Sequence, residues 1–144
     1  MLEFLGLNNF FNATADDDWY VLFQLGQPTL GFPTESYTIL GQQLTDVDNS
    51  IQCKQGSYCE STKPCNELND LGEIYVTMGG NDYSVPVNAT YIDVAQGGSG
   101  KTYCVLQIQD IGSTVNYFIA GDVFFKLYYS AYNTQDSTIG LSVN

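Results

Sequence analysis

The stretch Val21–Thr34, VLFQLGQPTLGFPT, constrains the fold of this chain more than any other stretch. Its first three residues are β-formers that favour a buried strand, and Gly26 and Pro28 end that strand and force a turn. Thr34 is then predicted to cap the N-terminus of a helix that covers the turn, with Tyr37, Leu40 and Leu44 spaced to share one face of it. The stretch therefore predicts a strand, a loop and a helix in succession, with Gln24 at the end of the strand.

Composition narrows the class of protein and the partners it can have. A chain of 144 residues can form one modest domain and is too short for two. Hydrophobic residues make up 44%, and the 11 tyrosines and 8 phenylalanines favour a packed β-sheet core. The net charge of −12 predicts no nucleic-acid partner, and the absence of histidine removes Ser-His, Cys-His and His-metal chemistry. No apolar window is long enough to insert into a membrane, and we expect no cofactor.

The same stretch resembles the second active-site loop of the pepsin-like aspartic proteases. In that family hydrophobic residues precede Asp-Thr-Gly-Thr-Ser, and a Pro-Thr helix start follows. Here Gln24-Leu25-Gly26-Gln27-Pro28 occupies the position of the motif. The motif glycine is matched by Gly26, and Leu30, Pro33 and Thr34 match the residues that follow it.

The resemblance implies a loop without its catalytic carboxylate. In the family two aspartates, one per lobe, share a proton and activate a water molecule. Gln24 stands where one aspartate would be, and an amide does not titrate in this way. Leu25 lacks the hydroxyl with which the motif threonine braces the two loops. The sequence therefore predicts a pseudoprotease that is not an enzyme, with a degenerate loop of Gln24, Leu25, Gly26 and Gln27 and no catalytic residue.

Four cysteines, Cys53, Cys59, Cys65 and Cys104, require an explanation. Their spacing is wrong for paired zinc ligands and no histidine is present, so disulfides are predicted and a metal site is not. The residues alone leave the pairing open. The resemblance implies a Cys65–Cys104 bridge, which leaves Cys53 with Cys59.

Two sequons, Asn12-Ala13-Thr14 and Asn88-Ala89-Thr90, predict glycosylation at Asn12 and Asn88. Together with the disulfides they favour a secreted or extracellular protein of the secretory pathway. Asp16-Asp17-Asp18 lacks the alternating spacing of a calcium-binding loop and is predicted to be a solvated turn.

The second half of the chain is predicted to consist of strands and turns. Residues 74–85 favour a hairpin with a Gly-Gly turn. AQGGSGKT, residues 95–102, ends like a phosphate-binding loop, but a β-type segment follows instead of a helix, so a hairpin tip is predicted. Residues 118–125 resemble the hydrophobic-hydrophobic-Gly-Asp segment of the family, and Asp122 is predicted to begin a short helix.

These observations predict an all-β, pepsin-like C-terminal lobe with one or two short helices. Residues 1–144 would form a single domain that lacks the first strands of the lobe. We expect a structural or assembly role in a complex or filament, with a protein partner that is either a second copy or a chain supplying the missing lobe. The alternative is a peptide- or glycan-binding module that uses the former substrate cleft. A third interpretation, one chain of an active two-chain protease, would require a carboxylate from elsewhere.

Overall fold

The structure is a computed structural model that describes residues 2–4, 8–11, 20–78 and 80–143. Asn12 and Asp16–Asp18, for which glycosylation and a solvated turn are predicted, lie outside the described residues. The strands are β1 (Leu2–Phe4), β2 (Asn8–Phe11), β3 (Tyr20–Phe23), β4 (Leu30–Phe32), β5 (Ile51–Cys53), β6 (Tyr58–Ser61), β7 (Glu73–Met78), β8 (Asn81–Pro86), β9 (Tyr91–Gln96), β10 (Lys101–Asp110), β11 (Tyr117–Ala120), β12 (Tyr128–Asn133) and β13 (Thr138–Val143). The helices are α1 (Thr34–Val47) and α2 (Asp122–Leu127), with 3-10 turns η1 (Cys65–Glu67) and η2 (Val87–Thr90).

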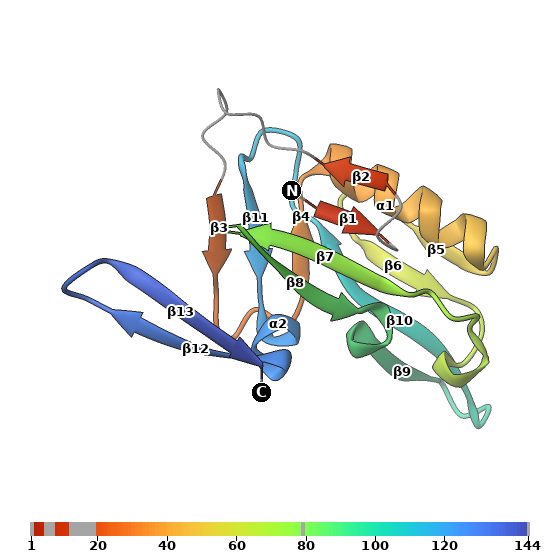
Figure 1. The fold of residues 1–144 in the computed structure, drawn as a ribbon. Coiled ribbons are helices and arrows are strands. Elements are labelled where there is room, and N and C mark those ends of the chain that lie inside the picture. The colour runs from red at the N-terminus through yellow and green to blue at the C-terminus, as the bar shows by residue number, and fades with distance from the viewer. Residues whose placement is uncertain (1, 5–7, 12–19, 79, 144) are drawn as a thin grey trace.

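The predicted all-β fold class is confirmed, and the strands form three sheets (Figure 1). The largest has seven strands, in the order β3-β11-β4-β10-β6-β5, with β9 also paired to β10. In this sheet β3 runs parallel to β11, and β4 runs parallel to β10. A second sheet has the order β2-β1-β7-β8, and β12 and β13 form a separate two-stranded ribbon. The sheet order brings β3, β4 and β11 together, so the predicted loop lies beside a segment from the far end of the chain.

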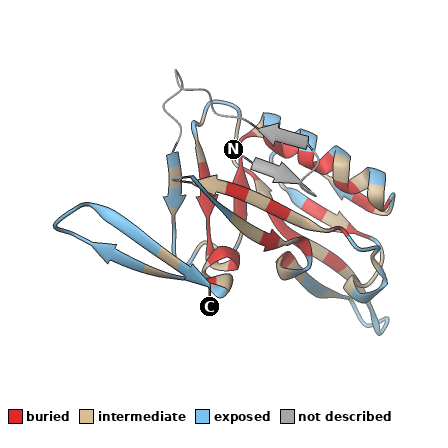
Figure 2. Ribbon diagram, in the orientation of Figure 1, coloured by how far each residue is buried: buried red, intermediate tan, exposed pale blue. Residues whose placement is uncertain are grey.

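The core lies between the sheets and under α1, where buried residues gather in Figure 2. Tyr37, Leu40 and Leu44 are predicted to share one face of the helix, and all three are buried. Leu30 and Phe32 of β4 are fully buried as well, because this strand is central in its sheet. Burial of these side chains is the main stabilising contribution in this part of the fold.

The start of α1 differs from the prediction. Pro33 occupies the N-cap position and Thr34 is the first helical residue, so Thr34 is not the cap. Its hydroxyl donates to Asp110 Oδ1 over 2.6 Å. Asp110 also accepts from the amides of Gly56 at 2.7 Å and Gly112 at 3.0 Å. Burial alone would raise the pKa of Asp110, but these three hydrogen bonds lower it below its ordinary value. The partner of Thr34 is 76 residues away, which is why local capping rules missed it.

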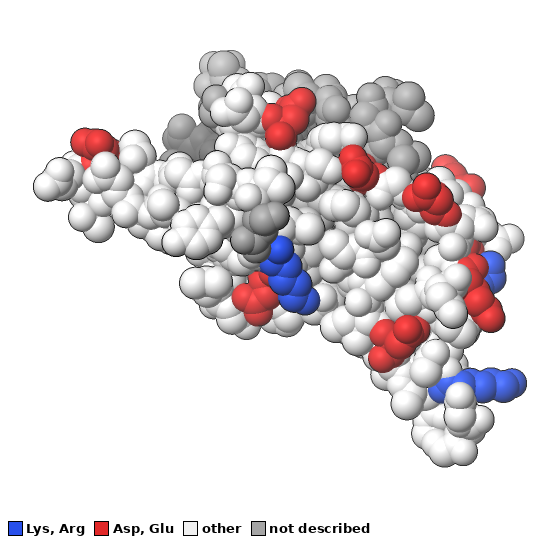
Figure 3. Space-filling model, turned by 60° about the horizontal axis from the view of Figure 1, so that its bottom comes forward, with Lys and Arg blue, Asp and Glu red and all other residues white. Residues whose placement is uncertain are grey.

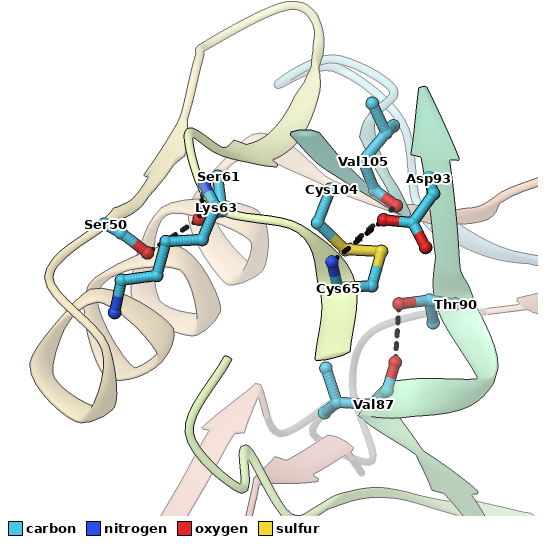
Figure 4. The surroundings of a disulfide bond; sticks show 9 residues. All are labelled: Ser50, Ser61, Lys63, Cys65, Val87, Thr90, Asp93, Cys104 and Val105. Atoms are coloured by element: carbon cyan, nitrogen blue, oxygen red, sulfur yellow. Dashed lines mark hydrogen bonds between the residues drawn. A yellow bond between two sulfur atoms is a disulfide. The ribbon is translucent and has the colours of Figure 1, made fainter. Parts of the chain in front are cut away.

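One disulfide joins two neighbouring strands of the large sheet, and the other joins a 3-10 turn to a central strand. Cys53–Cys59 links β5 to β6, and Cys65–Cys104 links η1 to β10. Figure 4 shows the second bridge, beside which Asp93 Oδ1 accepts from the Cys65 amide over 2.9 Å. These are the two pairs that the resemblance implies.

The two predicted hairpins are present. β7 pairs with β8, and β9 pairs with β10 on either side of residues 97–100. The glycine-rich run is therefore followed by a strand, and the hairpin-tip prediction is confirmed. In the part of the chain that the structure describes, no helix has the length and apolar character needed to cross a membrane.

Asp48 is a buried carboxylate that ties the end of α1 to the segments around it. It is 2% exposed and accepts from the Ser50 and Asn69 amides, each at 3.0 Å. The Ser50 hydroxyl donates to it over 2.7 Å, and Lys63 Nζ lies 3.5 Å from its Oδ1. Burial acts to raise the pKa of Asp48, but these hydrogen bonds and the Lys63 charge lower it to about 2.

Asp48 is therefore expected to make stability depend on pH in acid. Its folded-state pKa lies below the ordinary value of 3.8, so its contribution is complete above about pH 4 and is lost as the pH falls through about 2. We expect Asp48→Asn to remove roughly 2 kcal/mol of stability at neutral pH and to flatten the stability profile between pH 4 and 2. Urea unfolding at several pH values measures both effects. Asp46→Asn, on the exposed side of the same helix, removes an equal charge without emptying a buried site and is the control, which should cost less stability at neutral pH.

Candidate functional site

The loop that joins β3 to β4, residues 24–29, is held by backbone bonds to the segment around β11 and α2. The Gln24 amide donates to the Ala120 carbonyl at 3.1 Å, and the Asp122 amide donates to the Gln27 carbonyl at 2.7 Å. Asp122 Oδ1 accepts from the Gly26 amide at 2.9 Å. Gly26 has a φ of +88°, a conformation that glycine adopts without steric cost. Gln24, Gly26 and Gln27 of the loop are thus all held by Ala120 and Asp122.

Asp122 begins α2 as predicted, and its carboxylate also contacts the loop. Its Oδ1 accepts from the amide of Gly26, 96 residues earlier in the chain, and the helix has no side-chain cap. Gly121, at the N-cap of α2, lies directly against the loop. A Cβ atom there would be 2.2 Å from the carbonyl oxygens of both Gln27 and Thr29. Only a residue without a side chain allows β11 and the loop to approach this closely.

The far end of the loop carries a small polar network. Gln27 Nε2 donates to Thr29 Oγ1 and to Gln109 Oε1, each at 3.0 Å. The Thr29 hydroxyl also donates to Gln109 Oε1 at 2.8 Å. This network ties the loop to β10 through side chains as well as backbone, and Gln109 is a site residue that sequence reasoning missed. No local pattern marks it, because its partners are about 80 residues away.

The tip of the loop faces solvent. Gln24 is exposed, and the side chain of Leu25 is 71% exposed. Gln24 therefore presents an amide that can donate and accept hydrogen bonds but does not exchange a proton in the accessible pH range. Leu25 adds an apolar group beside it. Such a pair can hold a peptide group or an apolar side chain by ordinary contacts.

The remaining predicted sites lie elsewhere. Asn88 is exposed in η2, whereas Thr90 of the same sequon is buried and its hydroxyl donates to the Val87 carbonyl at 2.7 Å (Figure 4). Among the described residues there is no group of three or more His, Cys, Asp or Glu side chains that could hold a metal ion. Acidic side chains are scattered over the face drawn in Figure 3, with basic ones between them.

Comparison with known proteins places the chain in a family. The sequence model of the family described as "Eukaryotic aspartyl protease" matches residues 29–144. The chain belongs to this family. It is 31% identical over 116 residues to a pregnancy-associated glycoprotein of Equus caballus, a match that covers 76% of the chain and 28% of that protein. It is 24% identical over 131 residues to pepsin A of Canis lupus familiaris, covering 89% of the chain and 31% of pepsin A.

A solved structure supports the fold of this aspartyl-protease-like chain. The aspartic proteinase from Irpex lacteus superposes with a TM-score of 0.59 at 19% identity, covering 80% of the chain and 34% of the proteinase. At this identity the likeness concerns the fold alone. The chain spans less than a third of the length of the two sequence relatives.

The expectation that this chain is not an enzyme is contradicted by these comparisons. The matching family is one of proteases, and pepsin A is among the relatives. The expectation relied on two side chains, Gln24 and Leu25, in one loop. Catalysis in this family uses a pair of carboxylates, and one loop in a chain that spans less than a third of its relatives does not decide the activity of the whole.

The two disulfides indicate an oxidising compartment, because such bonds are rare where thiols are kept reduced. Relatives named as glycoproteins are in keeping with the same route. The chain is therefore an aspartyl-protease-like domain of the secretory pathway.

Proposed function

We propose that residues 1–144 form the C-terminal lobe of an aspartyl-protease-like protein and that this lobe serves assembly with a second β-rich protein lobe. The contact would be made by the ribbon of β12 and β13, whose edges and exposed face would join the partner's sheet. In the isolated chain the partner would be a second copy of the chain. The location would be secreted or extracellular, which the disulfides and the exposed Asn88 support.

The observation that carries this proposal is the exposure of the ribbon. In the described part of the chain, β12 and β13 pair only with each other and project away from the core (Figures 1 and 2). Every residue from 131 to 140 is exposed. A two-stranded ribbon is marginally stable in water unless something packs against it. A free ribbon of this length also offers two unpaired edges to another chain.

The register of the ribbon gives it one apolar face. Tyr128 lies opposite Val143, Ser130 opposite Leu141, and Tyr132 opposite Ile139. Directly opposed residues point to the same side, and alternate residues share a face, so these three pairs lie on one face. Tyr128 is 8% exposed and anchors the face in the core, whereas Tyr132, Ile139 and Val143 are 54%, 41% and 81% exposed. The apolar face therefore continues beyond the core without cover among the described residues.

The oligomeric state of the purified chain tests the proposal. We expect the wild-type chain to form dimers or larger species at about 50 μM, measured by light scattering after size exclusion. Ile139→Lys should shift it to the monomer, because a charge on the apolar face of the ribbon cannot be buried in a contact at low cost.

Ile92→Lys is the matched control. Ile92 is 43% exposed on β9, close to the 41% of Ile139, but it lies outside the ribbon. The control should keep the wild-type size. A monomeric wild-type chain at 50 μM, or an equal shift in both variants, would contradict the assembly role.

A second candidate function is peptide binding at the loop of residues 24–29. It is favoured by the exposure of Leu25 and the anchored Gln27–Thr29–Gln109 network beside it. A binding lobe of this kind need not self-associate without its ligand, so the same measurement of oligomeric state separates the two functions.

A further inference from the structure

We propose that a polar depression between β5, β6 and the β9–β10 hairpin binds a neutral carbohydrate. The depression has a volume of about 280 Å³ and is lined by Ser50, Gln52, Glu60, Ser61, Thr62, Gln96 and Tyr103. Hydroxyl, amide and carboxylate groups make up the lining, with a single aromatic ring. The site is independent of the assembly surface and of the loop of residues 24–29.

The floor of the depression is an ordered chain of hydrogen bonds. Ser50 Oγ and Ser61 Oγ lie 2.6 Å apart and face each other in Figure 4. Ser50 donates its hydrogen to Asp48, since a carboxylate only accepts. Ser61 must then donate to Ser50, while Ser61 Oγ also accepts from the Lys63 amide at 3.1 Å. Both hydroxyl hydrogens are thus used within the protein, and the floor offers acceptor lone pairs to a ligand that can donate.

The walls offer donors and acceptors that are not used elsewhere. Among the described residues, the side chains of Gln52, Gln96, Thr62 and Tyr103 have no hydrogen-bond partner in the protein. Each amide side chain can donate and accept, and the Tyr103 ring presents an apolar surface above a polar floor. A sugar ring has the complementary chemistry, with hydroxyls that donate and accept around its edge and C–H groups on its face. The combination of one ring with several convergent polar groups is typical of ligand sites.

The charges around the depression favour a neutral ligand over an anion or a metal cation. An anion would meet Glu60 in the lining, with the buried Asp48 carboxylate behind Ser50, in a chain of net charge −12. A metal cation would compete with two lysines that are already in place. Lys63 Nζ lies 3.5 Å from Asp48 Oδ1, and Lys54 Nζ lies 3.1 Å from Glu60 Oε1. A neutral ligand requires no new charge pairing at the site.

The depression has room for more than one sugar ring. A neighbouring cavity of about 430 Å³ shares Thr62 and Gln96 with it and continues along the hairpin to Lys101. The site is also distinct from the protease-like loop. Tyr103 and Gln109, which touches that loop, are separated by six residues of β10, or about 20 Å along a strand.

Titration of the ¹⁵N-labelled chain followed by NMR tests the inference. The probes are N,N′-diacetylchitobiose, mannotriose, lactose and maltotriose, each to about 10 mM, with calcium chloride and sodium sulfate as charged probes. We expect at least one sugar to shift the amides of residues 50–52, 60–62 and 96–103. Tyr103→Ala should weaken that sugar about tenfold or more, whereas Tyr103→Phe, which keeps the ring, should stay within about threefold. Gln55→Ala, outside the depression, is the control and should bind as wild type.

Each remaining outcome would overturn the inference. These are the absence of shifts with all four sugars, shifts with calcium or sulfate alone, and sugar binding that survives Tyr103→Ala in a folded protein. The amide spectrum of each variant reports folding, so loss of binding is scored only where the dispersion of the wild type is retained.

Discussion

Replacing Cys65 and Cys104 together by alanine is expected to lower the free energy of unfolding by about 4 kcal/mol. The bridge closes a loop with a sequence separation of 39 residues, and the loss of chain entropy on closing such a loop in the unfolded state has about this size, about 4 kcal/mol. Cys104 is also fully buried in the core. The loop contains the β7–β8 hairpin, η2 and β9, so without the bridge the start of this segment at η1 is held to β10 by non-covalent packing alone. Chemical unfolding of the variant, followed by tyrosine and tryptophan fluorescence, measures the change.

The other disulfide is the internal comparison. Cys53–Cys59 spans only six residues, so its replacement by two alanines should cost about 2 kcal/mol. The test is which double variant loses more free energy of unfolding. A larger loss for the short bridge, or equal losses, would show that loop closure does not account for the stabilisation. Peptide mapping of the wild type under non-reducing conditions checks that both bridges are present in the material.

Gly121→Ala is expected to destabilise the chain by about 3 kcal/mol or more and to disorder the loop of residues 24–29. The added methyl group would lie 2.2 Å from the backbone oxygens of Gln27 and Thr29, far inside any van der Waals contact. These oxygens belong to the backbone, so no side-chain rotation can relieve the overlap. β11 and the loop must separate, and the bond from the Asp122 amide to the Gln27 carbonyl is lost with them.

Gly140→Ala is the matched control for this change. A Cβ atom at Gly140 would be 3.8 Å from the Ala131 carbonyl oxygen, an ordinary contact, and the substitution removes the same conformational freedom. Its thermal midpoint should stay within a few degrees of the wild type. Should Gly121→Ala unfold at the same denaturant concentration as the control, the close approach of β11 to the loop would be contradicted.

Local pattern alone was sufficient for much of the fold. The sequence predicts the strand before Gln24, the buried helix face of Tyr37, Leu40 and Leu44, and the hairpin around residues 97–100, and each is present. The predicted burial of that strand is wrong, because β3 lies at the edge of its sheet and Leu22 is 44% exposed. These features depend on periodicity and on turn residues that act within a few positions of each other. The glycine-rich run is a clear case, because the β-type residues after it exclude a phosphate-binding helix start.

The function of the loop was less accessible to the same reasoning. Gln24 is one position in one segment, and the conclusion that the chain is not an enzyme went beyond what that position determines. Family membership contradicted it through the match of residues 29–144 as a whole. The residue identifies what this loop can do chemically, but activity in this family depends on groups brought together from two lobes.

The sequence by itself determined the order of the main strands, turns and helices and the buried face of α1, because those properties follow from neighbouring residues. Only the tertiary structure decided which polar groups meet. Thr34 bonds Asp110 and Gly26 bonds Asp122, pairs separated by 76 and 96 residues. It also decided that the apolar face of the β12–β13 ribbon extends beyond the core, since the same alternating pattern would have been buried under a neighbouring sheet. Contacts of this kind depend on the order of strands in a sheet, and that order is set by the packing of the whole chain.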